Sequence, residues 1–165
     1  LPSLAGERLC SDELQVVCAP DHALARCRSV AAGALVEHAY LSREQGSGTR
    51  DVTDHYLTRA GIEPGALNVV MEASSLEALK GLVEAGMGFA IMSHVSVLKE
   101  VRLGLLVRIP LSPPITRQLT AVYPRERIQS GLVGAFVQFA KRRLDAPPGE
   151  AAEEKELAIS ARSAP

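Results

Sequence analysis

The sequence predicts an α/β fold, in which a mostly parallel sheet carries helices on both faces. Short apolar, β-branched runs alternate along the chain with segments whose apolar residues recur at helical spacing, and this alternation is typical of parallel sheets. Residues 89–92 (FAIM) form a continuous apolar run, as expected for a strand covered on both faces, so we place it at the centre of the sheet. Hydrophobic residues make up 47% and charged residues 22% of the 165 residues, a composition that supports a buried core.

The remaining elements follow from hydrophobic periodicity and from residues that start or stop helices. Strands are expected over residues 14–19, 39–42, 68–73, 89–92, 106–109 and 119–123. Helices are expected over 30–37, through the amphipathic segment that ends before Gly61, over 74–86, over 93–103 and from 130 to about 144. Ser74 followed by Glu77 predicts a capping box at the start of the third helix, because each side chain can satisfy an unpaired backbone N–H.

Charge and hydropathy exclude two classes of partner. Eighteen basic and nineteen acidic residues leave a net charge of −1, so this segment lacks the positive field that attracts nucleic acid. No apolar run approaches the roughly 20 residues of a membrane helix, and no signal-peptide pattern opens the chain. We therefore expect a cytoplasmic protein without membrane contact.

Catalytic and metal-binding patterns are missing from the sequence, which favours binding over chemistry. We predict no catalytic residue, no metal site and no cofactor. The cysteines form no C-x-x-C pair and are expected to be reduced and buried; they are Cys10, Cys18 and Cys27. The histidines have no metal-ligand spacing and are expected at the surface or in turns; they are His22, His38, His55 and His94.

The stretch REQGSGTR, residues 43–50, is the first candidate site. It follows a predicted strand and precedes a predicted helix, so its backbone N–H groups should face the solvent at the positive end of the helix dipole. Ser47 and Thr49 add hydroxyl groups, and Gly48 permits close approach of a ligand. These residues predict an anion-binding turn, although Ser47 or Thr49 could simply cap the helix.

Two further junctions repeat this arrangement. Ser74 and Ser75 stand where the next strand meets a helix, and Ser93 with His94 follows the central strand. Capping alone would also account for these serines. Because ligands of open α/β sheets bind where the carboxyl ends of the strands meet helix N-termini, the three junctions are expected to converge.

A series of motifs resembles the effector-binding region of LysR-type transcriptional regulators. The motifs are LQVVCAPDHALA, REQGSGTR, MEASSLEALKGLVEAGMGFAIMS, LTAVYPR and GLVGAFVQFAKRRL, within residues 10–144. The resemblance implies a periplasmic-binding-protein-like fold of two lobes with an incomplete first lobe. Residues 1–23 would hold a first-lobe segment and a crossing strand, 24–114 the second lobe, 115–144 the second crossing strand and a first-lobe helix, and 145–165 a flexible tail.

The resemblance also implies a function and a set of contacts. Ser47, Gly48, Thr49 and Ser74 would face the inducer, with Ser75 beside them, and Met92 and Ser93 would line the same cleft. The inducer would be a carboxylate or another small anion, the protein a homo-oligomer, expected as a homodimer, and DNA would be bound only through a domain absent from this chain. Two alternatives stay open: a transporter's solute-binding protein for a small anion, and a small enzyme such as a dehydratase.

Overall fold

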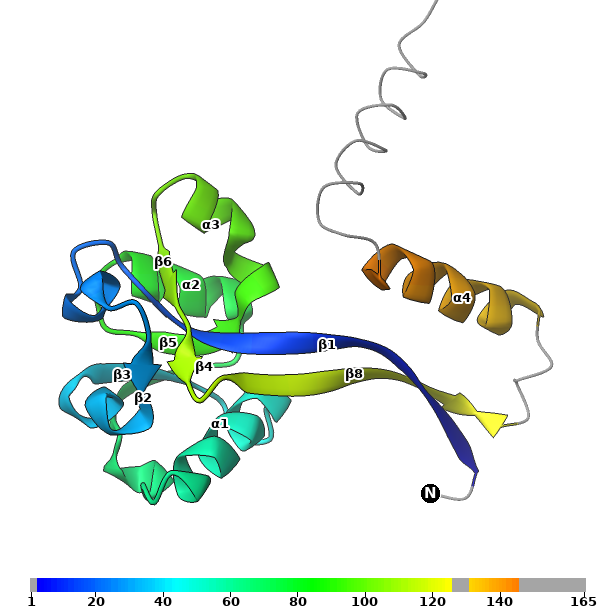
Figure 1. Cartoon of the computed structure of the whole chain (residues 1–165), viewed down its shortest axis with the longest axis horizontal. Coiled ribbons are helices and arrows are strands. Elements are labelled where there is room, and N and C mark those ends of the chain that lie inside the picture. The colour runs from blue at the N-terminus through cyan, green and yellow to red at the C-terminus, as the bar shows by residue number, and fades with distance from the viewer. Residues whose placement is uncertain (1–2, 126–130, 146–165) are drawn as a thin grey trace, which may run out of the picture. The chain divides into compact units, whose positions relative to one another are not determined.

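The computed structural model describes residues 3–125 and 131–145, which form two compact units (Figure 1). One unit is Asp12–Arg117, and the other combines the residues up to Ser11 with those from Gln118 onward. The boundaries fall inside two long strands, β1 (Leu4–Cys18) and β8 (Ile115–Pro124), which pair with each other. The domain limits predicted at 23/24, 114/115 and 144/145 stay a prediction, and the predicted tail lies almost entirely outside the described residues.

The unit Asp12–Arg117 alternates strands and helices. Its strands after β1 are β2 (Val30–Ala31), β3 (Ala39–Arg43), β4 (Asn68–Ala73), β5 (Ala90–Ser93), β6 (Val107–Ile109) and β7 (Leu111–Ser112). Its α-helices are α1 (Gly48–Arg59), α2 (Leu76–Glu84) and α3 (Leu98–Arg102). Short 3₁₀ segments cover Ala23–Arg26, Ala32–Glu37, Pro64–Ala66 and His94–Val97.

The sheet is mixed and not mostly parallel as predicted, and β5 lies inside it, between β1 and β3. β1 runs antiparallel between β5 and β6, so that Val16 pairs with Ile91 on one side and Ile109 on the other. On its other side β5 approaches β3 through a parallel bridge between Tyr40 and Phe89. β3 pairs with β4 and β2 with β7, both in parallel. The antiparallel pairs arise because β1 is inserted between the two strands that the α3 crossover joins.

Helices cover both faces of this sheet, as predicted for the α/β class. Successive side chains of β1 point to opposite faces: Leu14 and Val16 belong to the cluster that includes Leu57 of α1, whereas Val17 belongs to the cluster that includes Leu79 of α2. In Figure 1, α1 and α2 lie on opposite sides of the strands.

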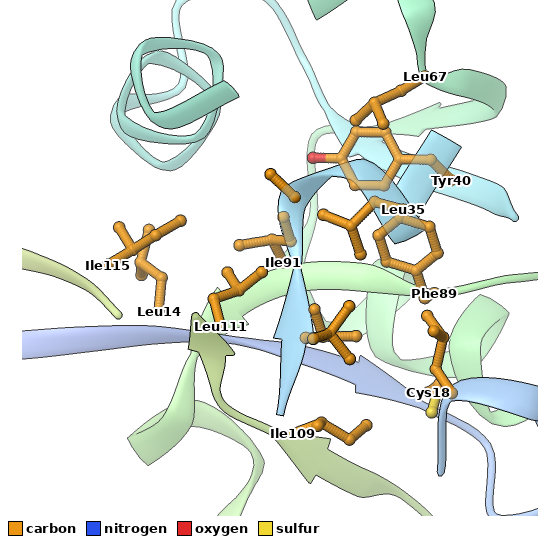
Figure 2. Packing of buried hydrophobic residues seen from close by; sticks show 14 of the residues in the cluster. Leu14, Cys18, Leu35, Tyr40, Leu67, Phe89, Ile91, Ile109, Leu111 and Ile115 are labelled. Atoms are coloured by element: carbon orange, nitrogen blue, oxygen red, sulfur yellow. The ribbon is translucent and has the colours of Figure 1, made fainter. Parts of the chain in front are cut away.

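The larger cluster holds the aromatic residues of the core. Figure 2 shows Tyr40 and Phe89 beside Leu35, and Leu14 next to Ile115. The Tyr40 and Phe89 rings are 5.1 Å apart between centroids, a separation at which aromatic pairs attract each other. Burial of Tyr40 is the main reason that its pKa rises to about 12.

Gly88 permits the close approach of β3 and β5. Its φ is +154°, and a Cβ atom added there would lie 2.4 Å from the carbonyl oxygen of Ala39. That oxygen accepts a hydrogen bond of 2.9 Å from the Phe89 N–H, and Leu41 N–H in turn donates to Phe89 O at 2.8 Å. A side chain at position 88 would therefore separate the two strands.

The other unit contains the first part of β1, the second part of β8 and helix α4 (Gly131–Asp145). The Gln118 amide donates to Ser11 Oγ at 2.8 Å, and Lys141 Nζ lies 2.8 Å from a carboxylate oxygen of Glu7. Val137 of α4 is buried. No helix in the described ranges is long and apolar enough to cross a bilayer.

Three predicted helix starts are wrong. Residues 30–37 form β2 and a 3₁₀ segment instead of a helix. α2 begins at Leu76 and is capped by Ser75, whose Oγ accepts from Ala78 N at 3.4 Å, so Ser74 is not the capping residue that the predicted capping box requires. Ser93 makes no side-chain cap, and the predicted helix 93–103 divides into a 3₁₀ segment and α3.

The cysteines also differ from expectation. All three are free thiols, but only Cys18 is buried; Cys10 is half-buried and Cys27 is exposed. Cys18 lies at the end of β1 within the larger core cluster. Burial, with a smaller contribution from Asp21, raises the pKa of the Cys18 thiol to about 11.

Candidate functional site

A small cavity in the unit Asp12–Arg117 collects residues from the predicted junctions. Its volume is about 90 Å³. The lining residues come from β3, β5 and the segment after it, the first turns of α1 and α2, and β8; they are Arg43, Thr49, Leu76, Met92, Ser93, Ser96 and Arg117. The chain reaches this arrangement because strand ends and helix starts meet at one edge of the sheet.

Arg117 and Asp12 form the ion pair of this cavity. Arg117 Nε and Nη2 each lie 2.8 Å from Asp12 Oδ2, a two-point contact that orients the guanidinium group. Asp12 is only 4% exposed. Its other carboxylate oxygen accepts a hydrogen bond of 2.6 Å from the Ser93 hydroxyl. This network holds strands β1, β5 and β8 together at the cavity wall.

The hydroxyl groups of Thr49 and Ser93 in the cavity wall differ in the hydrogen bonds that they can still make. Thr49 Oγ1 accepts from Arg117 Nη1 at 3.0 Å, so its own hydrogen stays available for a ligand. Ser93 has already donated its hydrogen to Asp12 and can only accept further bonds. Thr49 is therefore the better hydroxyl donor for an anion in this cavity.

Arg43 supplies the second guanidinium group. It makes two hydrogen bonds to the Glu44 carboxylate, at 2.8 and 2.9 Å, and a longer one of 3.3 Å to the carbonyl of Ser74. The bonds from Arg43 lower the pKa of Glu44. Arg50 donates to the carbonyl of Arg43 at 3.0 Å and to Glu72 at 2.7 Å. These contacts tie the end of β3 to both α1 and β4.

Two helix N-termini add a positive potential at the cavity. In α1, Asp51 N–H donates to Ser47 O at 3.0 Å, and in α2 Leu79 N–H donates to Ser75 O at 3.0 Å. The backbone N–H groups that come before Asp51 and Leu79 precede the first hydrogen bond within their helix. They lie at the positive end of the helix dipole. Thr49 and Leu76, which line the cavity, belong to these first turns. Such an arrangement favours an anion.

The structure brings some of the predicted site residues to this cavity and leaves others beside it. Thr49, Met92 and Ser93 line it. Ser47 is buried and precedes α1 without a side-chain capping bond, and Gly48 is the first residue of that helix.

The serines before α2 have separate roles, and the charged wall residues are not among the predicted ones. Ser74 contributes its carbonyl oxygen to Arg43, and Ser75 caps α2. Sequence reasoning missed Arg43, Arg117 and Asp12. Arg43 belongs to the predicted anion-binding turn and could have been found there. Asp12 and Arg117 lie 105 positions apart, so no local pattern connects them.

The chemistry of the wall suits reversible binding of a small anion. It combines guanidinium groups, hydroxyls and helix amides, which are the groups that recognise carboxylates and phosphates. Among residues 3–125 and 131–145, no group of three or more His, Cys, Asp or Glu side chains could hold a metal ion.

A mixed α/β sheet with a small cavity of basic and hydroxyl side chains at its strand ends is typical of ligand-binding domains, and comparison with known proteins specifies which kind. The family model described as "LysR substrate binding domain" matches residues 1–145, and the chain belongs to this family. The resemblance inferred from the motifs is thereby confirmed.

Two curated relatives are regulators of transcription. The chain is 32% identical over 139 residues to a probable RuBisCO transcriptional regulator of Cyanidioschyzon merolae, covering 84% of this chain and 46% of the relative. It is 35% identical over 127 residues to the HTH-type transcriptional regulator CbbR of Cereibacter sphaeroides, covering 76% and 40%. The chain thus spans less than half the length of these relatives.

A solved structure supports the fold. The regulatory domain of CcmR from Synechocystis PCC6803, in complex with 2-PG, matches with a TM-score of 0.76 at 24% identity, covering 87% of this chain and 68% of that one. The predicted periplasmic-binding-protein-like α/β fold is therefore confirmed.

Proposed function

We propose that this chain is the effector-binding region of a LysR-type transcriptional regulator and that its cavity binds a small anion, either a carboxylate or a phosphate. Two helix N-termini, two guanidinium groups and the hydroxyl hydrogen of Thr49 at one cavity carry the proposal. A volume of about 90 Å³ is well below the roughly 300–1,000 Å³ of pockets for drug-sized ligands, so the effector would contact this unit through a small group. Ser47, Gly48, Ser74 and Ser75 would support the helix starts around it.

The effector would act by favouring one conformation of the regulator over another. A differential affinity of about 1–3 kcal/mol is sufficient for regulation. The response would reach DNA through parts of the regulator outside this chain and through a homo-oligomer. Such a protein would work in the cytoplasm without catalysing a reaction. Family membership and the regulator names of the relatives favour this function over a transporter's solute-binding protein or an enzyme.

Calorimetric titration of the full chain with inorganic phosphate, acetate and 2-PG tests the proposal. Thr49→Val removes one hydrogen-bond donor, and we expect about fivefold to tenfold weaker binding. Arg43→Gln removes a charge and should weaken binding further. Arg28→Gln is the matched control, because Arg28 is exposed and outside the cavity lining. Unchanged affinities in both cavity variants, or no heat with any of these anions, would contradict the proposal.

A further inference from the structure

A second and larger cavity lies in the same unit, beside helix α1. Its volume is about 420 Å³, which is within the range of small-molecule sites. One wall comes from α1 and the residue after it, and the other from residues 113–116, which lead into β8. Its apolar part includes Val52, Tyr56, Ala60, Pro113, Pro114 and Ile115. None of its lining residues belongs to the lining of the first cavity.

The polar groups of this second cavity are suited to an anion. Arg59 and His55 line it and are exposed. Arg59 forms no ion pair within the described ranges. No described acidic side chain lines the cavity. An unpaired guanidinium group beside apolar surface attracts a negatively charged partner and can bind it at two points.

Tyr56 contributes apolar surface to this cavity. Its hydroxyl oxygen is buried and has no hydrogen-bond partner among the described residues, so that atom lies away from the accessible space of the cavity. The polar contacts of a ligand would therefore come from the exposed side chains of Arg59 and His55.

We propose that this cavity binds a monocarboxylate with an apolar body. The apolar body packs against Val52, Ile115 and the two prolines, and the carboxylate accepts hydrogen bonds from Arg59. The site is independent of the effector cavity, since it requires neither of the guanidinium groups there. It nevertheless contacts the same two elements, because α1 carries Thr49 and β8 carries Arg117.

Calorimetric titration of the full chain with hexanoate tests this site, with 1-hexanol as the neutral counterpart. We expect binding of hexanoate but not of 1-hexanol at the same concentrations. Arg59→Gln should weaken hexanoate binding by about fivefold or more, the loss expected for a charged hydrogen-bonding partner. Ala60→Leu should weaken it, because the larger side chain narrows the cavity while position 60 is exposed in the folded chain.

A matched control and a second ligand separate this site from the effector cavity. Arg102→Gln is the matched control, since Arg102 is also exposed, in the last turn of a helix, and outside both cavity linings. It should bind hexanoate as the parent chain does, and circular dichroism should show every variant folded. Equal affinity for 1-hexanol, no hexanoate binding by the parent chain, or undiminished binding by folded Arg59→Gln and Ala60→Leu would overturn the proposal. Arg59→Gln should bind inorganic phosphate, the probe of the first cavity, as the parent chain does; loss of that binding would overturn the independence of the site.

Discussion

Replacing Asp12 by Asn tests whether the ion pair with Arg117 holds the cavity wall. The carboxylate is 4% exposed and accepts bonds from Ser93 at 2.6 Å and from Arg117 Nε and Nη2 at 2.8 Å. An asparagine has nearly the same shape as aspartate but only one acceptor oxygen. Its amide nitrogen, itself a donor, would face either the Ser93 hydroxyl or the Arg117 guanidinium group, which are also donors. Hydrogen bonds to a charged group contribute about 1.5–3 kcal/mol each and are not additive. We therefore expect a loss of about 2–4 kcal/mol in the free energy of unfolding.

Urea unfolding followed by circular dichroism measures this loss. With a denaturant slope of about 2 kcal/mol/M, the midpoint should fall by about 1–2 M. Glu37→Gln is the matched control, because it also removes one carboxylate but from an exposed position, and its midpoint should stay close to that of the parent chain. If Asp12→Asn unfolds at the same urea concentration as the control, the pair does not hold the wall and the reasoning is refuted.

Three other predictions concern the core. Leu57 is fully buried, so Leu57→Ala should lower the free energy of unfolding by about 2–5 kcal/mol, as measured with urea. The control Thr58→Ala changes an exposed residue and should alter it by no more than about 0.5 kcal/mol. Equal effects of the two substitutions would contradict the burial of Leu57. Because burial raises the pKa of Tyr40 from 10.0 to about 12, its contribution to stability is present below a pH of about 10 and is lost as the pH rises through about 12. An ultraviolet titration should show one tyrosine ionising late, and the same titration of Tyr40→Phe should lack that step. At about pH 8 a disulfide reagent should label exposed Cys27 readily but Cys18 only after unfolding, since the Cys18 thiol is buried and stays protonated; rapid labelling of Cys18 would disprove its burial.

Local patterns predict the central part of the fold well and its first strand poorly. The strand expected over residues 68–73 has the same bounds as β4, because a β-branched run between turn residues strongly favours a strand over a helix. β1 begins at Leu4 instead of residue 14, since its first part mixes charged residues and a glycine with apolar ones and lacks a clear period. That part of the strand depends on its pairing with β8, which is distant in sequence.

Only those residues of the candidate site that belong to a local sequence pattern can be predicted. Thr49 and Ser93 follow from strand-to-helix junctions, and both line the cavity; whether they contact an effector stays a prediction. Arg117 lies in a strand with no helix start nearby, and its role depends on a carboxylate from the other end of the chain. Hydroxyl-rich turns can be recognised in the sequence, whereas charge pairs between distant strands require the fold.

The contact at Gly88 has a consequence for genetic screens of this protein. With 2.4 Å between an added Cβ and the carbonyl oxygen of Ala39, even an alanine there would separate two strands of the sheet. Under the proposed function, such an allele would lose the response to the effector although every side chain of the cavity kept its identity. A mutant of this kind would be mistaken for a recognition defect unless its folding were measured first.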